Sequence, residues 1–122
     1  MFKVIALLKR RADLSHEAFV EYYESRHAPL ALQLMPGILA YRRNFLDPSG
    51  MIVHTGGAVP DFDVITELWF ADRAAFDSAM RAFEDPAVMD RLARDEANLF
   101  ERNHTRFIAV DEHISQIAPR SA

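Results

Sequence analysis

The sequence predicts an α+β fold of the ferredoxin-like type, in which a split βαβ pattern forms a four-stranded antiparallel sheet. The expected order of elements along the chain is strand, helix, strand, strand, helix, strand. The length of 122 residues suits one domain, and 50% hydrophobic with 26% charged residues is typical of a globular chain. We expect residues 1–115 to form this single domain and residues 116–122 to form a C-terminal tail.

The first strand and the first helix follow from local signals. Residues 2–8 are short, apolar and rich in β-branched side chains, which favours a strand covered on both faces. Ser15 is a suitable N-cap for a helix that follows. Pro29 disfavours the α conformation of the residue before it, so we expect this helix to break or kink at residues 27–28. A short helical extension over residues 30–34 should follow.

The remaining elements are marked by turn residues and caps. A turn at residues 47–50 and a loop over residues 51–60 separate two apolar runs. Asp72 is expected to cap a second helix, and a further helical stretch should begin at Asp85, with Pro86 in its first turn. The last three strands are expected at residues 38–46, 62–70 and 105–115.

The later strands are apolar on both sides, although two helices can cover only one face of a sheet. An uncovered apolar face of this size exceeds what monomers usually tolerate. We therefore expect a homodimer in which two sheets face each other, giving a dimeric α/β-barrel. On that face Glu67 and Trp69 would line a cavity between the two sheets.

Composition excludes several classes of function. The net charge of −4 argues against a nucleic-acid-binding protein. The absence of cysteine excludes thiol nucleophiles, disulfides and thiolate metal sites. The longest apolar run is too short to span a membrane and lacks a cleavage site, so a cytoplasmic location is the default and no membrane partner is expected. No nucleotide-binding glycine loop or nucleophile elbow is present.

Three residues are candidates for chemistry. His27 is on the apolar face of the first helix at the expected break, where it is either a general base or a buried histidine that ties down the kink. Tyr41, on the second strand, could donate a hydrogen bond to an oxyanion, and His54 is in a loop where binding residues concentrate. A metal site from His27, His54 and Glu67 is conceivable, but no close-spaced ligand motif supports it, so we expect no metal.

Further residues are candidates for substrate binding. Arg42 and Arg43 point to opposite faces of their strand, and either could hold a phenolate or enolate. Asp63 and Glu67 are about 13 Å apart along one strand face, too far for a carboxylate pair, so each would act alone. Apolar walls would come from the aromatic residues Phe19, Tyr22, Phe45, Trp69 and Phe100.

Nearly the whole chain, from about residue 2 to residue 112, resembles the EthD family. The matching segments are residues 8–11, 14–19, 23–30, 62–70, Asp95-Glu96 and 107–112, and the most specific part is Arg26-His27-Ala28-Pro29-Leu30. The resemblance implies a dimeric α/β-barrel. Relatives include methylmuconolactone isomerases, aromatic polyketide cyclases and fungal dehydratases or decarboxylases, which work without metal or organic cofactor. The same barrel also holds haem-degrading monooxygenases.

The resemblance also implies site residues. In the methylmuconolactone isomerase branch a histidine before Ala-Pro, a tyrosine on the second strand and a histidine in the next loop line the pocket. His27, Tyr41 and His54 match these by order and approximate spacing. That branch has a pocket cysteine on its third strand, which this chain lacks, and this argues against the same reaction.

We therefore expect a cofactor-independent lyase or isomerase, of the dehydratase or cyclase type, that moves a proton on an oxygenated aromatic, lactone or polyketide-like molecule in catabolism or secondary metabolism. His27 would be the base, Tyr41 with Arg43 or Arg42 would polarise the substrate, and His54 would be a second proton-transfer group. The alternatives are a non-catalytic protein that binds a hydrophobic metabolite or a partner enzyme and, less favoured, a haem monooxygenase.

Overall fold

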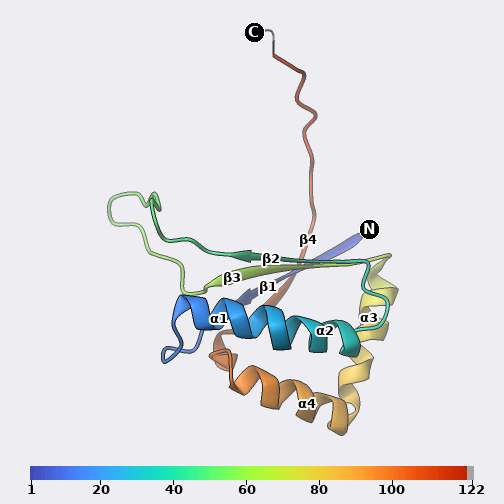
Figure 1. The fold of residues 1–122 in the computed structure, drawn as a ribbon. Coiled ribbons are helices and arrows are strands. Elements are labelled where there is room, and N and C mark those ends of the chain that lie inside the picture. Colours follow the sequence, from blue (N-terminus) through green and yellow to red (C-terminus); the bar gives the residue numbers. More distant parts are fainter. Residues whose placement is uncertain (121–122) are drawn as a thin grey trace.

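A four-stranded antiparallel sheet and a layer of helices form the molecule, described for residues 1–120 by a computed structural model. The strands lie in the order β2-β3-β1-β4, and the helices cover one face of the sheet (Figure 1). This confirms the predicted ferredoxin-like fold. The strands are β1 (Phe2–Leu8), β2 (Ala40–Phe45), β3 (Val64–Phe70) and β4 (Arg106–Val110). The helical segments are α1 (His16–Tyr22), η1 (Tyr23–His27), α2 (Ala28–Leu34), α3 (Arg73–Arg81), η2 (Ala82–Glu84), α4 (Pro86–Ala97) and η3 (Arg102–His104).

The predicted helix starts are confirmed by their caps. The hydroxyl of Ser15 accepts a hydrogen bond from the backbone N–H of Ala18 at 3.1 Å, and the Asp72 carboxylate accepts one from Ala75 at 2.8 Å. The Asp85 side chain caps α4 in the same way, with Pro86 in the first turn. These side chains satisfy backbone donors that have no partner within the helix.

The expected break at residues 27–28 is wrong, because the helix continues through this point. Residues of η1 form one π-helical turn, in which the N–H of Ala28 bonds to the carbonyl of Tyr23, five residues earlier. Pro29 then lies in the first turn of α2, where a missing N–H costs little. The wider turn buries both Tyr23 and His27, and such turns occur frequently at functional sites.

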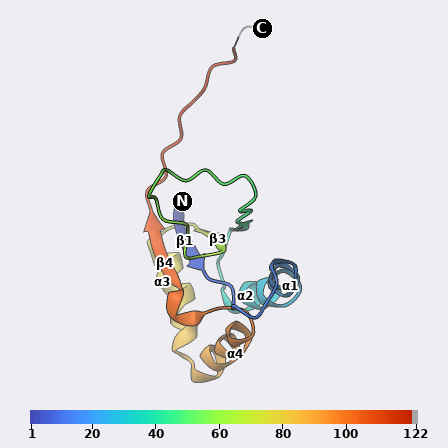
Figure 2. The same ribbon diagram turned by 90° about the vertical axis from the view of Figure 1, so that its left-hand side faces the viewer.

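The last strand is shorter than predicted. Val110 pairs with Lys3, near the start of β1, so β1 offers almost no further residues for pairing. The chain from 111 to 120 therefore contains no strand and leaves the body along an extended path (Figure 2). Of the predicted tail, residues 121–122 lie outside the described part of the chain.

An aromatic cluster joins the helices to the sheet. Phe19, fully buried on α1, contacts Tyr23, Phe45 and Phe100 edge to face, with ring centroids about 6 Å apart. Phe100 is fixed beside β1 by its bridge to Arg10. The cluster thereby sets the position of η1 relative to the end of α4.

No helix within residues 1–120 combines the length and the apolar character needed to cross a membrane.

Replacement of Phe19 by alanine should test this cluster. We expect Phe19→Ala to lower the free energy of unfolding by about 3–5 kcal/mol, because a large buried ring leaves a cavity. The matched control is Ile52→Ala, since Ile52 is 95% exposed on the loop between β2 and β3. Urea unfolding of both variants measures the difference, and equal small losses would contradict the central role of Phe19.

Candidate active site

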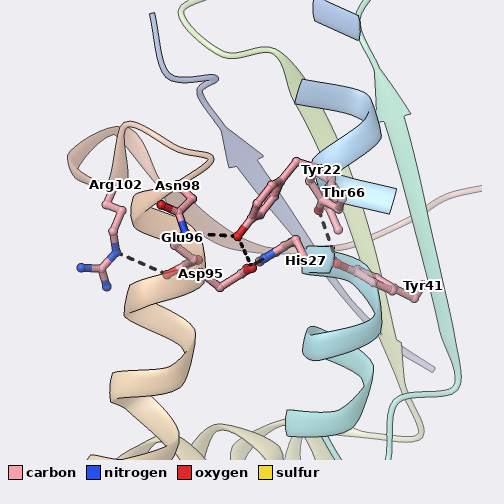
Figure 3. A network of polar contacts seen from close by, with 9 residues as sticks. Tyr22, His27, Tyr41, Thr66, Asp95, Glu96, Asn98 and Arg102 are labelled. Carbon is pink, nitrogen blue, oxygen red and sulfur yellow. Dashed lines mark hydrogen bonds and ion pairs between the residues drawn. The ribbon is translucent and has the colours of Figure 1, made fainter. Parts of the chain in front are cut away.

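A cavity of about 320 Å³ lies between the helix layer and the helix-facing side of the sheet. Its walls are predominantly apolar, and its volume suits a small organic molecule. Seven polar side chains line it, and they come from η1, β2, β3, α4, η3 and the residue after η3: Tyr23, His27, Tyr41, Thr66, Glu96, Arg102 and Thr105. Figure 3 shows how His27, Tyr41, Thr66, Glu96 and Arg102 lie relative to one another.

This cavity is not the one expected from the sequence, which was to lie on the face of the sheet without helices. Glu67 and Trp69 are on the face of β3 turned away from the helices, since their neighbours Thr66 and Leu68 point into the core. Glu67 instead pairs with Lys3 at 2.6 Å, and that hydrogen bond lowers the pKa of Glu67 below its usual value. Neither residue lines the cavity of this chain.

His27 is held by a carboxylate from another helix. Its Nδ1 atom is 2.6 Å from Oδ2 of Asp95, near the end of α4, and both side chains are less than a tenth exposed. An ionised carboxylate only accepts hydrogen bonds, so the ring donates from Nδ1, and in the uncharged tautomer with this donor Nε2 keeps its lone pair. Nε2 has no hydrogen-bond partner among residues 1–120, and the ring lines the cavity. This arrangement suits a general base.

A second hydrogen bond fixes Asp95. The phenol of Tyr22 donates to Oδ1 of Asp95 at 3.0 Å, and the amide of Asn98 donates to the same phenol at 3.3 Å. Tyr22 therefore holds Asp95 in place and does not line the cavity. Aromatic rings restrain the imidazole as well, since Tyr23 and Phe100 contact it edge to face at 4.8 and 5.1 Å.

Three hydroxyl groups form a chain on the sheet side of the cavity. The phenol of Tyr23 lies 2.5 Å from the hydroxyl of Thr66 and 3.4 Å from the phenol of Tyr41. Burial raises the pKa of Tyr23 and of Tyr41 well above the ordinary tyrosine value. Both phenols therefore stay protonated at neutral pH and can donate hydrogen bonds.

Glu96 brings a carboxyl group into the same cavity. Its side chain is 12% exposed, and Nε of Arg102 lies 3.4 Å from Oε1. Burial raises the pKa of Glu96, while the charges of His27 and Arg102 act in the opposite direction.

The other predicted site residues have different surroundings. Phe19, Phe45 and Phe100 belong to the aromatic cluster of the core. On β2, Arg43 faces the helices and pairs with Glu24 at 2.7 Å, while Arg42 is on the opposite face beside Trp69.

Two predicted residues lie towards the loop that joins β2 to β3. Asp63 accepts a hydrogen bond from the backbone of Arg10 at 2.8 Å, outside the cavity. His54 lies exposed in the loop and does not line the cavity. The structure thus brings His27 and Tyr41 to one cavity and does not bring His54 there.

Sequence reasoning missed Tyr23, Thr66, Asp95, Glu96 and Arg102. Asp95 and Glu96 belong to the segments that resemble the EthD family. Nothing in the sequence links them to His27, however, because Asp95 lies 68 residues after it. Within residues 1–120, no group of three or more potential ligand side chains could hold a metal ion.

Solved structures with the same fold include three informative cases. An EthD family protein from Bacillus halodurans is 24% identical, with 93% of this chain and 100% of that chain covered and a TM-score of 0.61. SnoaB, a cofactor-independent oxygenase from Streptomyces nogalater, is 12% identical, with 93% and 94% covered and a TM-score of 0.57. A dimeric ferredoxin-like protein of unknown function from Jannaschia is 13% identical, with 91% and 98% covered and a TM-score of 0.54.

No curated protein matches this chain in sequence. The family model of the EthD domain matches residues 11–103. This is most of the chain, and it contains both His27 and Asp95. This chain therefore belongs to the EthD family.

Proposed function

We propose that this protein is a cofactor-independent enzyme that transfers a proton on a small oxygenated aromatic, lactone or polyketide-like molecule, as a lyase or isomerase and in the first place as a dehydratase. The observation that carries the proposal is His27, whose Nδ1 is held by Asp95 and whose ring lines an apolar cavity with no further hydrogen-bond partner among residues 1–120. A base in a dry, preorganised site is what such reactions need.

In this mechanism Nε2 of His27 removes a proton from a carbon next to a carbonyl group. Asp95 stabilises the imidazolium ion that forms, as the carboxylate of a catalytic triad does. The phenol of Tyr41, with Tyr23 and Thr66 behind it, donates a hydrogen bond to the oxygen on which negative charge develops. The apolar walls exclude water that would otherwise compete for these groups.

A cofactor-independent oxygenase is the second candidate, and the resemblance in fold to SnoaB is what brings it forward. Such an enzyme can use the same first step, because a carbanion or phenolate formed by a base can react with oxygen. A protein that only binds a hydrophobic metabolite would use the cavity without any proton transfer.

Deuterium exchange separates these functions. The purified protein is mixed in D2O with β-hydroxyketones, butenolides and phenolic 1,3-diketones, and NMR follows exchange at the acidic carbon. Exchange with loss of water or rearrangement supports the proposal, and consumption of oxygen supports the oxygenase. Ligand binding without exchange would indicate a non-catalytic binding protein, and a haem-coloured preparation would indicate a haem enzyme.

Replacement of His27 tests the base. We expect His27→Gln to lower turnover by about 10²- to 10⁴-fold, the usual contribution of general acid–base catalysis. The glutamine amide can still donate to Asp95, so the melting temperature should change little. His27→Ala, which leaves the buried Asp95 with one fewer donor, should also be less stable by about 1–3 kcal/mol. A folded His27→Gln protein with unchanged turnover would refute the assignment.

Replacement of Asp95 tests the orientation of the base. In Asp95→Asn the amide can donate to Nδ1, which moves the ring proton to Nε2 and removes the lone pair that the reaction needs. We expect turnover to fall by at least about 10²-fold while substrate affinity changes much less. Asp90→Asn, an exposed change on the same helix, is the matched control. Equal turnover in both variants would show that Asp95 has no catalytic part.

We also propose that two copies form a homodimer through the face of the sheet that lacks helices. This face carries the apolar side chains of Ile5, Leu7, Ile65 and Ile108, together with Trp69. The dimeric Jannaschia protein has the same fold, which supports such an assembly.

Sedimentation tests the dimer. The wild-type chain should sediment at twice 13.9 kDa at micromolar concentration. Ile108→Arg, which puts a charge on the edge strand β4, where Ile108 is about half exposed on this face, should shift it to the monomer. Leu32→Arg places the same charge on α2, where Leu32 is also about half exposed, and should leave the dimer intact. A wild-type monomer would disprove the assembly.

A further inference from the structure

Two adjacent carboxyl groups near the end of α4 have very different surroundings. Asp95 points towards η1 and accepts hydrogen bonds from His27 and Tyr22. Glu96 is the next residue and lines the apolar cavity. Within residues 1–120 its carboxylate accepts one long side-chain hydrogen bond, from Nε of Arg102 at 3.4 Å. Pairs of titratable groups in contrasting surroundings are typical of acid and base assignments in enzymes.

The charged groups around Glu96 come from three elements. His27 faces it from η1, Arg102 from η3, and Asp95 is its neighbour on α4. Burial in the cavity raises the pKa of Glu96, and the neighbouring positive charges offset this only in part. Glu96 therefore keeps its proton to a higher pH than an ordinary glutamate does, and in its protonated form it has an O–H group to donate.

We infer that Glu96 is the general acid that acts together with His27, and that the substrates are β-hydroxycarbonyl compounds with an apolar or aromatic body. The inference rests on the proposed function and extends it to a second catalytic residue and a substrate class. It is carried by the position of Glu96 in the same cavity as His27 and Tyr41.

The reaction balances with these groups alone. Nε2 of His27 takes the proton from the α-carbon, and the electron pair of that C–H bond forms the new double bond. The C–O bond at the β-carbon breaks as Glu96 gives its proton to the departing hydroxyl group, and water leaves. The imidazolium ion then returns its proton to the Glu96 carboxylate through water, which restores both groups.

The distribution of polar groups selects this substrate class. A β-hydroxycarbonyl molecule has three points that need a polar partner: the acidic C–H, the hydroxyl group and the carbonyl oxygen. The cavity offers His27 for the first, Glu96 for the second and the Tyr41–Tyr23–Thr66 hydroxyls for the third. Arg102, whose side chain is about half exposed, is a positioning residue that stabilises the Glu96 carboxylate after proton transfer.

The protonation of Glu96 is tested without any substrate. A raised pKa in the folded state gives a stabilising contribution that is complete below the ordinary carboxyl value and is lost as the pH rises through the folded value. Glu96→Gln removes this loss, so the variant should gain stability relative to wild type as the pH rises through that range. Urea unfolding across pH measures the difference, with the exposed Glu84→Gln as control. If the free energy of unfolding of Glu96→Gln differs from that of wild type by the same amount at every pH, the acid role is overturned.

The acid role itself is tested with a phenyl-substituted β-hydroxyketone in D2O. NMR follows exchange of the α-hydrogens, and ultraviolet absorption follows the conjugated enone that forms when water leaves. We expect Glu96→Gln to lower the ratio of elimination to exchange by about 10²-fold or more, whereas His27→Gln should abolish both. An unchanged ratio would overturn the role of Glu96 alone. A wild-type protein that neither exchanges nor eliminates would overturn the proposed function and the acid role together.

Discussion

The hydrogen bond between His27 and Asp95 is the contact on which the rest of the site depends. It joins η1 to the last turn of α4 at 2.6 Å, in a region where both side chains are almost fully buried. Burial of a charge is costly unless the charge is paired and hydrogen-bonded, and Asp95 satisfies this condition with two donors, His27 and Tyr22. The same bond decides which nitrogen of the imidazole is free. It therefore links the packing of two helices to the chemistry that the cavity can perform.

The π-helical turn explains how this bond forms. An uninterrupted α-helix from α1 to α2 would change the rotation of every residue after Tyr23 about the helix axis. Tyr23 and His27 are four residues apart, so they lie on the same side of the helix, and both are buried over the sheet; the extra residue of the π turn changes the direction of the side chains on either side of it relative to each other. Phe100, held beside β1 by the bridge to Arg10, then closes on the imidazole from the side of α4. Local helix geometry and long-range strand contacts thus both contribute to one catalytic candidate.

Much of the fold could be predicted from the sequence because its signals are local. Ser15, Asp72 and Asp85 cap helices by contacts within three residues, and apolar runs mark the strands. The end of β4 could not be predicted in this way, because it depends on where its partner β1 begins.

The site was only partly predictable, for the same reason. His27 and Tyr41 stand out by position and by family resemblance, but Asp95 and Glu96 reach the cavity through packing between α4 and η1. The position of the cavity also depends on packing. The apolar sheet face correctly indicated an uncovered surface, yet the polar groups that suit catalysis gather beneath the helices. The outer face, with Trp69 and Ile108, has no helix over it (Figure 1).

The most direct test of this account is the protonation state of the two ring nitrogens of His27. Long-range ¹H–¹⁵N spectra of the labelled protein at alkaline pH distinguish the two tautomers, and His27→Gln assigns the signal. We expect a proton on Nδ1 and a free lone pair on Nε2, with the Nε2 signal shifting when a β-hydroxyketone enters the cavity. A ring with its proton on Nε2, or an Nε2 signal that does not shift with such a ligand, would show that Asp95 does not prepare His27 as the base.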